Sequence, residues 1–276
     1  MANVVYMVED PVALIRLDRP EKLNAFTHAM IAEIRAAIDS AAADARVVGI
    51  VVTGTGRAFS AGLDTGDLAR SVSDAVRDAS QGVKSSSRAS SESELPALFS
   101  YLLRVPKPVI AAVNGVAAGG GFVLAMMCDL RFAAPAASFT TSFSKRGLIA
   151  EHGTSWLLPR MVGLSRALDL LWSARRVDAA EALRIGFVDR VVPETNLLDE
   201  AKTYIHELAA AVSPRSLAVI KAQLYSHSGI ALEPAIHETD RLMDDALAHP
   251  DAAEGVKSFV ERRPPRFARL KGHGYE

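Results

Sequence analysis

The chain has 276 residues, of which 49% are hydrophobic and 23% charged, and its formal net charge is −1. This balance gives no electrostatic argument for a nucleic-acid or anionic-membrane partner, and the single cysteine, Cys128, excludes an internal disulfide framework or a cysteine metal cluster. The first residues lack the charged and apolar pattern of a signal peptide, and no apolar run reaches membrane-spanning length, so we expect a soluble, cytoplasmic protein.

The first part of the chain predicts a hairpin, a helix and a buried strand. β-Branched runs at residues 4–7 and 12–17 flank a turn at residues 9–11, and Thr27 is a typical N-cap for the amphipathic helix that follows to about residue 40. The apolar run VVGIVVT at residues 47–53 predicts a strand buried on both faces, as in a parallel sheet. A glycine-rich segment, GTGRAFSAGLDTGDL, follows this strand directly.

The segment RSVSDAVRDASQGVKSSSRASSESE, residues 70–94, is rich in serine and charge and poor in large apolar side chains. It can bury little surface, so we expect a mobile, solvated excursion from the folded core. The alternative is a lid over a binding site, because the excursion begins directly after the glycine-rich segment.

A second glycine-rich turn follows the apolar strand predicted at residues 108–113. The stretch NGVAAGGGFVLAMMCD, residues 114–129, opens an apolar helix with three glycines. Glycines at a helix start serve either close backbone packing or the binding of an anion by unpaired N–H groups. Two such turns can present two N–H groups to one carbonyl oxygen on which negative charge develops. In the first glycine-rich segment, Gly54 and Gly56 match the start of the dinucleotide-binding pattern GxGxxG. Phe59 stands where that pattern needs its third glycine, so a dinucleotide site is disfavoured.

The rest of the chain changes from mixed strands and helices to helices alone. Runs at residues 130–133 and 189–192 predict further strands that alternate with helices, which indicates an α/β fold with a largely parallel sheet. From Leu197 onward the pattern is only helical, so we expect a core at residues 1–196 and a helical region at residues 197–276. Cys128, in the apolar helix, is expected to be a small core side chain.

Five segments in register carry a resemblance to a known family. In chain order they are LDRPEKLNAF at residues 17–26, AFSAGLD at 58–64, NGVAAGGG at 114–121, LLPRMVG at 157–163 and FVERRPPRF at 259–267. Together they resemble the crotonase (enoyl-CoA hydratase/isomerase) superfamily over nearly the whole chain. The resemblance implies a crotonase-like spiral of ββα units, followed by a C-terminal helical region that assembles the chain into a homotrimer or a dimer of trimers.

The same resemblance implies an acyl-CoA thioester as substrate. In this family two main-chain N–H groups hold the thioester carbonyl, and here they belong to Leu63 and Gly120, which would stabilise an enolate during reaction. Coenzyme A would enter as part of the substrate, and neither a separate cofactor nor a metal is expected. The resemblance implies two groups of residues that bind coenzyme A. Phe259 and Arg262 would bind the coenzyme A of a neighbouring subunit. The others lie at or beside the two donors: Arg57, Ala61, Leu63, Asp64 and Gly120.

The catalytic carboxylates are where the chain departs from the hydratases of this family. Val123 and Phe143 stand where the resemblance places the two hydratase glutamates, and neither side chain can activate water or protonate a carbon. Glu151 matches the acidic residue that shuttles the proton in enoyl-CoA isomerases. The resemblance therefore favours isomerisation of a double bond, with Glu151 as the base, over hydration.

Each candidate acid–base residue has a structural alternative. Glu151 would otherwise complement the N-terminus of a helix expected from about residue 153, and His152 would be a hydrogen-bonding residue beside a glycine turn. Asp64 is interpreted as a turn and capping residue, and Asp67 either caps the next helix or faces the site. Two further function classes stay open: a C–C or thioester hydrolase that uses Glu151 with His152, and a non-catalytic acyl-CoA binding protein.

Overall fold

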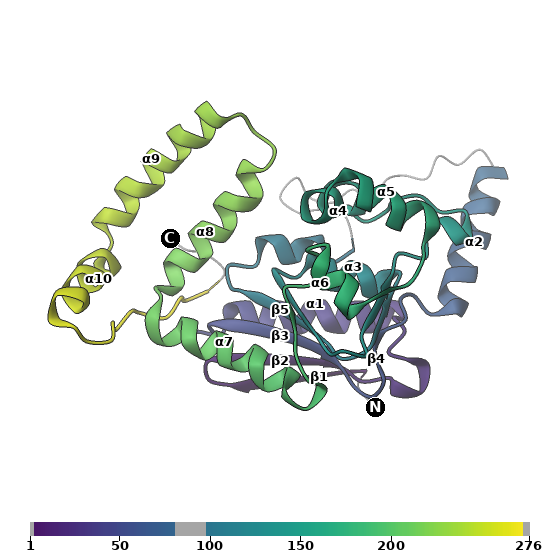
Figure 1. Cartoon of the computed structure of the whole chain (residues 1–276), viewed down its shortest axis with the longest axis horizontal. Helices are drawn as coiled ribbons and strands as arrows, with labels where there is room; N and C mark the ends of the chain where they lie inside the picture. The colour runs from purple at the N-terminus through teal and green to yellow at the C-terminus, as the bar shows by residue number, and fades with distance from the viewer. Residues whose placement is uncertain (1–2, 81–97, 273–276) are drawn as a thin grey trace.

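A six-stranded sheet lies at the centre of the computed structural model, which describes residues 3–80 and 98–272 (Figure 1). The strand order is β1-β2-β3-β5-β7-β10. β1 and β2 form the predicted antiparallel hairpin, and every later strand is parallel to its neighbour, which confirms the largely parallel sheet. The strands are Val4–Glu9 (β1), Val12–Leu17 (β2), Gly49–Gly54 (β3), Val109–Val113 (β5), Leu130–Ala133 (β7) and Arg190–Val191 (β10).

A second, four-stranded sheet has the order β4-β6-β8-β9. Its strands are Ala58–Ser60 (β4), Val116–Ala118 (β6), Ser138–Thr140 (β8) and Val177–Asp178 (β9). These four strands were not predicted from the sequence, in which each glycine turn follows the long strand directly. Segments of three residues or fewer are too short for an alternating pattern to identify a strand. With them, β3-β4-α2, β5-β6-α3 and β7-β8-α4 are successive ββα units.

The helices cover the sheets and then continue alone to the C-terminus (Figure 1). Thr27 caps α1 as predicted, because its Oγ1 accepts a hydrogen bond of 3.2 Å from the N–H of Met30. The helices are His28–Ala43 (α1), Thr65–Ser80 (α2), Gly120–Met127 (α3), Thr154–Val162 (α4), Leu164–Ser173 (α5), Ala179–Arg184 (α6), Leu197–Ala211 (α7), Pro214–His227 (α8), Leu232–Ala248 (α9) and Pro250–Glu261 (α10).

The segment predicted as a solvated excursion begins as a helix. Residues 70–80 belong to α2, so the segment is not a surface loop there, although residues 73, 74, 77 and 80 are exposed as a solvated excursion requires. Residues 81–94 lie outside the described residues. Two ion pairs between side chains three positions apart stabilise this helix: Arg70 with Asp67, and Arg77 with Asp74. A low content of large apolar residues therefore did not prevent helix formation.

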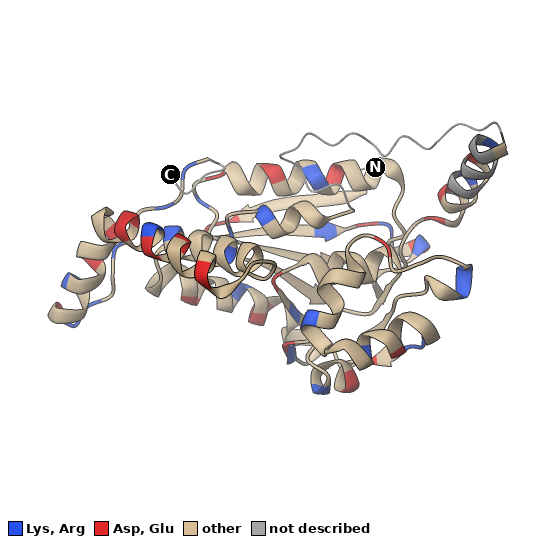
Figure 2. Cartoon of the chain, turned by 90° about the horizontal axis from the view of Figure 1, so that it is seen from above, with Lys and Arg blue, Asp and Glu red and all other residues tan. Residues whose placement is uncertain are grey.

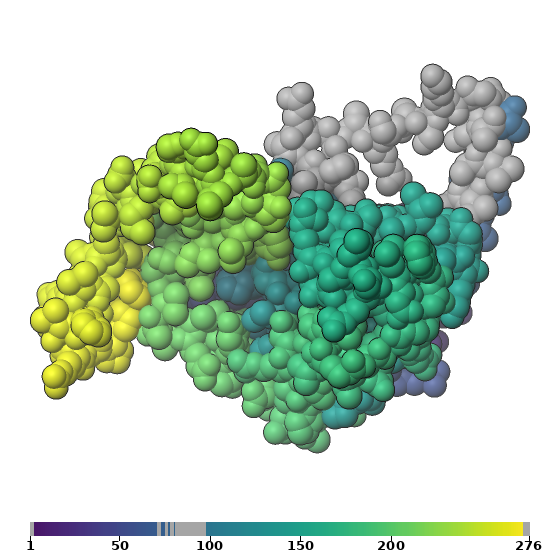
Figure 3. Space-filling model, turned by 45° about the horizontal axis from the view of Figure 1, so that its top comes forward, coloured from purple at the N-terminus to yellow at the C-terminus, as the bar shows by residue number. Residues whose placement is uncertain are grey.

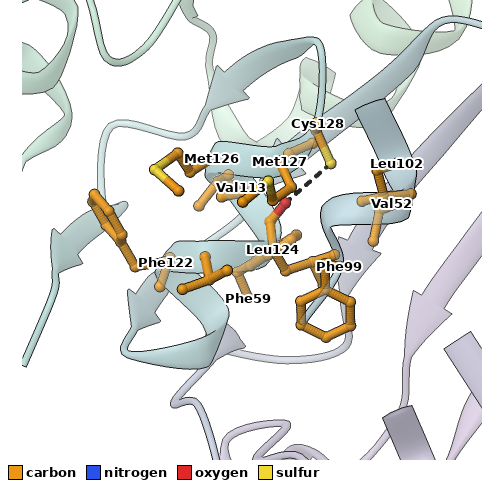
Figure 4. Packing of buried hydrophobic residues seen from close by; sticks show 14 of the residues in the cluster. Val52, Phe59, Phe99, Leu102, Val113, Phe122, Leu124, Met126, Met127 and Cys128 are labelled. Carbon is orange, nitrogen blue, oxygen red and sulfur yellow. Dashed lines mark hydrogen bonds between the residues drawn. The ribbon is translucent and has the colours of Figure 1, made fainter. Parts of the chain in front are cut away.

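α3 lies inside the molecule. From residue 122 to residue 128 every side chain is at most 2% exposed. The Cys128 thiol donates a hydrogen bond of 3.3 Å to the main-chain oxygen of Leu124, and it packs among apolar side chains (Figure 4). Burial raises the pKa of this thiol to about 12. The prediction that Cys128 is a core side chain is confirmed.

α7 packs on the other face of the central sheet. Along β3, Ile50 and Val52 belong to the core cluster that contains α3, whereas Val51 belongs to the cluster that contains α7. α7 approaches β3 closely, since a Cβ built on Gly49 of β3 would lie 2.8 Å from the side chain of Ile205 of α7. The two faces of the sheet are thus both buried, as the apolar run at residues 47–53 predicts.

α8 is tied to the core through Asp129, directly after α3. The Asp129 carboxylate accepts hydrogen bonds from Lys221 Nζ at 2.6 Å, from the Tyr225 hydroxyl at 3.0 Å and from the N–H of Val109 at 2.8 Å. Lys221 is 10% exposed at its side chain. One carboxylate therefore joins α8 to the start of β5.

α9 and α10 reach beyond this attachment (Figure 3). No residue of α9 is buried, and several large apolar side chains of the two helices are exposed, among them Leu232, Leu247, Val256, Phe259 and Val260. Figure 2 colours the acidic and basic residues of the described chain; α9 and α10 carry eight Asp or Glu residues but only two Lys or Arg. None of the helices in the described part of the chain is long and apolar enough to cross a membrane.

We expect Asp129→Ala to lower the free energy of unfolding by about 3 kcal/mol, because it leaves the Lys221 ammonium partly buried without its carboxylate. Urea denaturation measures this loss. The matched control is Asp245→Ala, which breaks an exposed pair with Arg241 and should change stability by less than about 0.5 kcal/mol. Equal effects of the two substitutions would contradict the anchoring role of Asp129.

Candidate active site

Two glycine turns lie side by side because β4 and β6 are parallel neighbours. Ser60 pairs with Ala117, so the segments that follow these strands leave the sheet at the same edge. At Gly62, where φ is +90°, a built Cβ would lie 2.6 Å from the main-chain oxygen of Ala118 and 2.9 Å from the main-chain nitrogen of Gly120. Only glycine allows this backbone conformation and this contact together.

The N–H group of Leu63 is aimed by the peptide bond to which it belongs. The N–H of Phe26 donates to the oxygen of Gly62 at 2.7 Å, and the N–H of Asp64 donates to the oxygen of Phe26 at 2.8 Å. In a trans peptide the C=O and the next N–H point in opposite directions. The N–H of Leu63 therefore points away from Phe26, and no acceptor for it is found among residues 3–80 and 98–272.

The N–H group of Gly120 is the first of α3. The preceding residue, Gly119, has φ 51° and ψ −117°, and its oxygen accepts from the N–H of Val123 at 3.0 Å, so the N–H of Gly120 points out of the helix start. The first N–H groups of a helix have no intrahelical acceptor, and the helix dipole makes this end positive. The described residues offer the N–H of Gly120 no acceptor either, so two donors without a partner in that part of the chain lie at adjoining turns.

A cavity of about 790 Å³ opens beside these donors. Most of the predicted site residues line it together: Ala61, Leu63, Asp64, Gly120, Glu151 and His152. Other lining residues have no role predicted from the sequence, among them Lys22, Phe26, His28, Ile31, Leu68, Leu98 and Arg146. Lys22 and Phe26 lie in the LDRPEKLNAF segment, and the family resemblance of that segment could have indicated that they lie near the site.

Glu151 and His152 form a pair at the start of α4. Glu151 Oε2 lies 3.6 Å from His152 Nε2, and both side chains are about one-third exposed, at 36% and 33%. Thr154 donates its N–H, at 3.1 Å, and its hydroxyl, at 2.7 Å, to the main-chain oxygen of Glu151. It is thus the main chain of Glu151 that caps this helix, and in the described chain no hydrogen bond joins the Glu151 carboxylate to an N–H of α4.

The imidazole of His152 is less basic than that of a free histidine. Burial lowers the pKa of His152, although the negative charge of Glu151 acts in the opposite direction. His152 also has a left-handed backbone, with φ +54°, which is uncommon for a residue other than glycine. A neutral ring at neutral pH can accept a proton.

The two positions of the hydratase glutamates are apolar in space as well as in sequence. Val123 is fully buried in the core, and Phe143, at 4% exposure, lines the cavity. Within the described residues, the carboxylates that line the cavity are those of Asp64 and Glu151. Asp64 accepts from the N–H of Gly66 at 3.0 Å and lies 3.5 Å from Arg19, so it acts as the turn residue that was predicted.

The remaining predicted residues lie away from the cavity of their own chain. Arg57 is exposed before β4, Phe259 is 84% exposed on α10, and Arg262 ends α10 in a left-handed conformation. Their binding to coenzyme A stays a prediction. Asp67 is buried and accepts at 3.3 Å from the N–H of His28, the first residue of α1, so it caps that helix. The described residues contain no group of three His, Cys, Asp or Glu placed to hold a metal.

Comparisons with known proteins agree with this geometry. The family model described as enoyl-CoA hydratase/isomerase matches residues 8–270. The chain is 37% identical over 267 residues to a probable enoyl-CoA hydratase from Rhodobacter capsulatus, covering 96% of this chain and 97% of that protein. It is 33% identical over 267 residues to the 1,2-epoxyphenylacetyl-CoA isomerase of Escherichia coli, covering 97% and 98%.

Solved structures show the same relationship in three dimensions. The crystal structure of an enoyl-CoA hydratase from Bacillus anthracis superimposes with a TM-score of 0.85 at 28% sequence identity, covering 96% of this chain and 99% of that one. The resemblance found in five sequence segments is therefore confirmed over almost the full length. The chain belongs to the enoyl-CoA hydratase/isomerase family, and its ββα spiral with helices α7–α10 is the crotonase fold.

Proposed function

We propose that this acyl-CoA enzyme is an isomerase that moves a carbon–carbon double bond beside a thioester. Leu63 and Gly120 donate their N–H groups to the thioester oxygen, and Glu151 transfers the proton. The observation that carries the proposal is that one cavity of about 790 Å³ holds both donors together with the Glu151 carboxylate, while Val123 and Phe143 occupy the other two acid–base positions.

The proposed reaction needs one base and one oxyanion site. Glu151 removes a proton from the carbon next to the thioester carbonyl of a 3-enoyl-CoA, and the electron pair moves into the carbonyl to form an enolate. The two N–H groups stabilise the oxygen charge. When the carbonyl re-forms, the double bond moves into conjugation and the terminal carbon of the allyl system takes the proton back from Glu151. Hydration needs a further acid–base group to activate water.

The names of the relatives divide between these reactions. The protein from Rhodobacter capsulatus is named a probable hydratase, and the protein from Escherichia coli is named an isomerase. The side chains of this chain favour isomerisation, because a valine in the core and a phenylalanine on the cavity wall provide no proton transfer.

A second candidate function is hydrolysis of a C–C or thioester bond. It is favoured by the contact of 3.6 Å between His152 and Glu151, since a neutral imidazole oriented by a carboxylate can take a proton from water. In this case the rate should fall as pH drops through the pKa of His152, which lies below its ordinary value.

For the assembly we propose a homotrimer or a dimer of trimers, and for its location the cytoplasm. The exposed apolar side chains of α9 and α10, including Leu247 and Phe259, support an interface between copies of the chain. In such an assembly Phe259 and Arg262 would bind the coenzyme A of a neighbouring subunit.

The first prediction concerns the substrate. Purified protein should isomerise 3-enoyl-CoA, leave saturated acyl-CoA intact and hydrate 2-enoyl-CoA very slowly, because each missing general acid–base group costs roughly 10²–10⁴-fold in rate. Absorbance of the conjugated thioester and chromatography of the products follow all three reactions. Hydration at a rate comparable with isomerisation would overturn the proposal, and hydrolysis alone would favour the second candidate.

The second prediction tests the donor at Gly120. Proline is tolerated at the first position of a helix but lacks the N–H group, so Gly120→Pro should fold and lose on the order of 10²–10³-fold in kcat. Gly120→Ala is the control for bulk, because it places the same Cβ 3.3 Å from the Phe26 ring and keeps the N–H. Leu164→Pro, at the exposed first position of α5 after Gly163, controls for proline itself. If Gly120→Ala loses as much activity as Gly120→Pro, the donor assignment is wrong.

The third prediction separates Glu151 from His152. Glu151→Gln keeps the size and the helix cap, which is made by the main chain, so acyl-CoA should bind as before while isomerisation falls by at least roughly 10²-fold. His152→Gln should retain most isomerase activity. Binding is measured by calorimetry and turnover by absorbance. The reverse order of the two losses would transfer the role of base to His152.

A further inference from the structure

The buried hydroxyl of Ser60 links the first glycine turn to the loop before α1. Ser60 is the last residue of β4 and has no exposed surface. Its Oγ accepts a hydrogen bond of 3.1 Å from the N–H of Gly62 and donates one of 2.8 Å to the main-chain oxygen of Asn24. A hydroxyl has one proton to donate, and here that proton and an acceptor site are both used.

Asn24 holds its place with hydrogen bonds from both ends of its amide. It is fully buried and has a left-handed backbone, with φ +54°. Its Oδ1 accepts from the N–H of Arg19 at 2.8 Å, and its Nδ2 donates to the oxygens of Ala58, at 2.8 Å, and Thr55, at 3.0 Å. The loop at Asn24 is thus fastened to the segment that leads into β4.

These contacts hold Gly62 on both sides. Its N–H is bonded to Ser60 Oγ, and its C=O is bonded to the N–H of Phe26 at 2.7 Å, two residues after Asn24. A glycine has two soft dihedral angles and no side chain to restrict them. Bonds to the peptide before it and to the peptide after it therefore set the direction of the Leu63 N–H, which belongs to the second of these peptides.

We propose that Ser60 and Asn24 are positioning residues for the oxyanion site, acting through Gly62 on the N–H of Leu63. This inference rests on the proposed function, in which that N–H binds the thioester oxygen. Neither side chain lines the cavity, so each acts on turnover through the main chain. A small rotation of the donor matters because stabilisation of an oxyanion depends on the alignment of the N–H with the oxygen.

Ser60→Ala removes one atom, the hydroxyl oxygen that joins the N–H of Gly62 to the main-chain oxygen of Asn24. We expect kcat for the isomerase reaction to fall about 10-fold, less than the 10²–10³-fold for a donor that is removed, with KM nearly unchanged. The matched control is Thr53→Val on β3. It removes another buried hydroxyl, which donates a hydrogen bond of 2.8 Å to the main-chain oxygen of Ala112 on β5. Thr53→Val should keep the kcat of the wild type.

Two binding measurements distinguish positioning from a general loss of structure. The infrared C=O stretch of a bound acyl-CoA labelled with ¹³C at the thioester carbon should lie below its value in buffer for the wild type and Thr53→Val, and closer to it for Ser60→Ala. The affinity for a thioether analogue, which has CH₂ in place of the carbonyl, should be equal in all three proteins. Ser60→Cys, whose thiol forms weaker hydrogen bonds, is a second variant with the same expectation.

The results separate this inference from the proposed function. An unchanged C=O stretch and kcat in Ser60→Ala overturn the positioning role, as does a wild type that does not shift the stretch at all. Equal losses in Ser60→Ala and Thr53→Val, with weaker thioether binding in both, also overturn it. A wild type that shifts the stretch but isomerises no 3-enoyl-CoA overturns the proposed reaction, and a smaller shift in Ser60→Ala then still supports the positioning role.

Discussion

The close contact between the turn at Gly62 and the start of α3 is the constraint on which the site depends. Parallel pairing of β4 with β6 brings the two turns together, and the absence of a side chain at Gly62 lets its backbone lie against the main chain of Ala118 and Gly120. The donors at Leu63 and Gly120 are then part of the rigid frame rather than of mobile side chains. Donors fixed in this way need no rearrangement when charge develops on a bound oxygen.

The acid–base side of the cavity is built differently. Glu151 and His152 lie in a turn before α4, where their side chains are about one-third exposed and lie 3.6 Å apart, between Glu151 Oε2 and His152 Nε2. Burial of Val123 and Phe143 meanwhile adds apolar packing where a two-carboxylate site would need polar partners. In the proposed mechanism the chain thus combines an oxyanion site made by the main chain at two packed turns with a proton-transfer side chain in a partly exposed turn.

Much of this arrangement could be predicted from the sequence, and the failures have identifiable causes. The hairpin, the cap at Thr27, the buried strands and the two glycine turns follow from local patterns that tertiary contacts reinforce. β4 and β6 escaped detection because strands of three residues have no readable period. Residues 70–80 of α2 were not predicted as a helix, because ion pairs between neighbouring turns of a helix, such as Arg77 with Asp74, are not visible in hydrophobic patterns. The links from Asn24 and Ser60 to Gly62 depend on contacts between distant segments, which no local pattern encodes.

The proposed use of the Leu63 N–H as a donor has a consequence for which substitutions this protein can accept. Every amino acid except proline carries the N–H, so the side chain at position 63 is free to vary with the shape of the substrate without loss of the donor. The neighbouring glycines have no such freedom, since a Cβ on Gly121 would lie 2.2 Å from the oxygen of Ser60. Positions that tolerate substitution and positions that do not therefore lie side by side at this site. Selectivity for the acyl group can change through the side chain at position 63 while the two N–H groups stay in place.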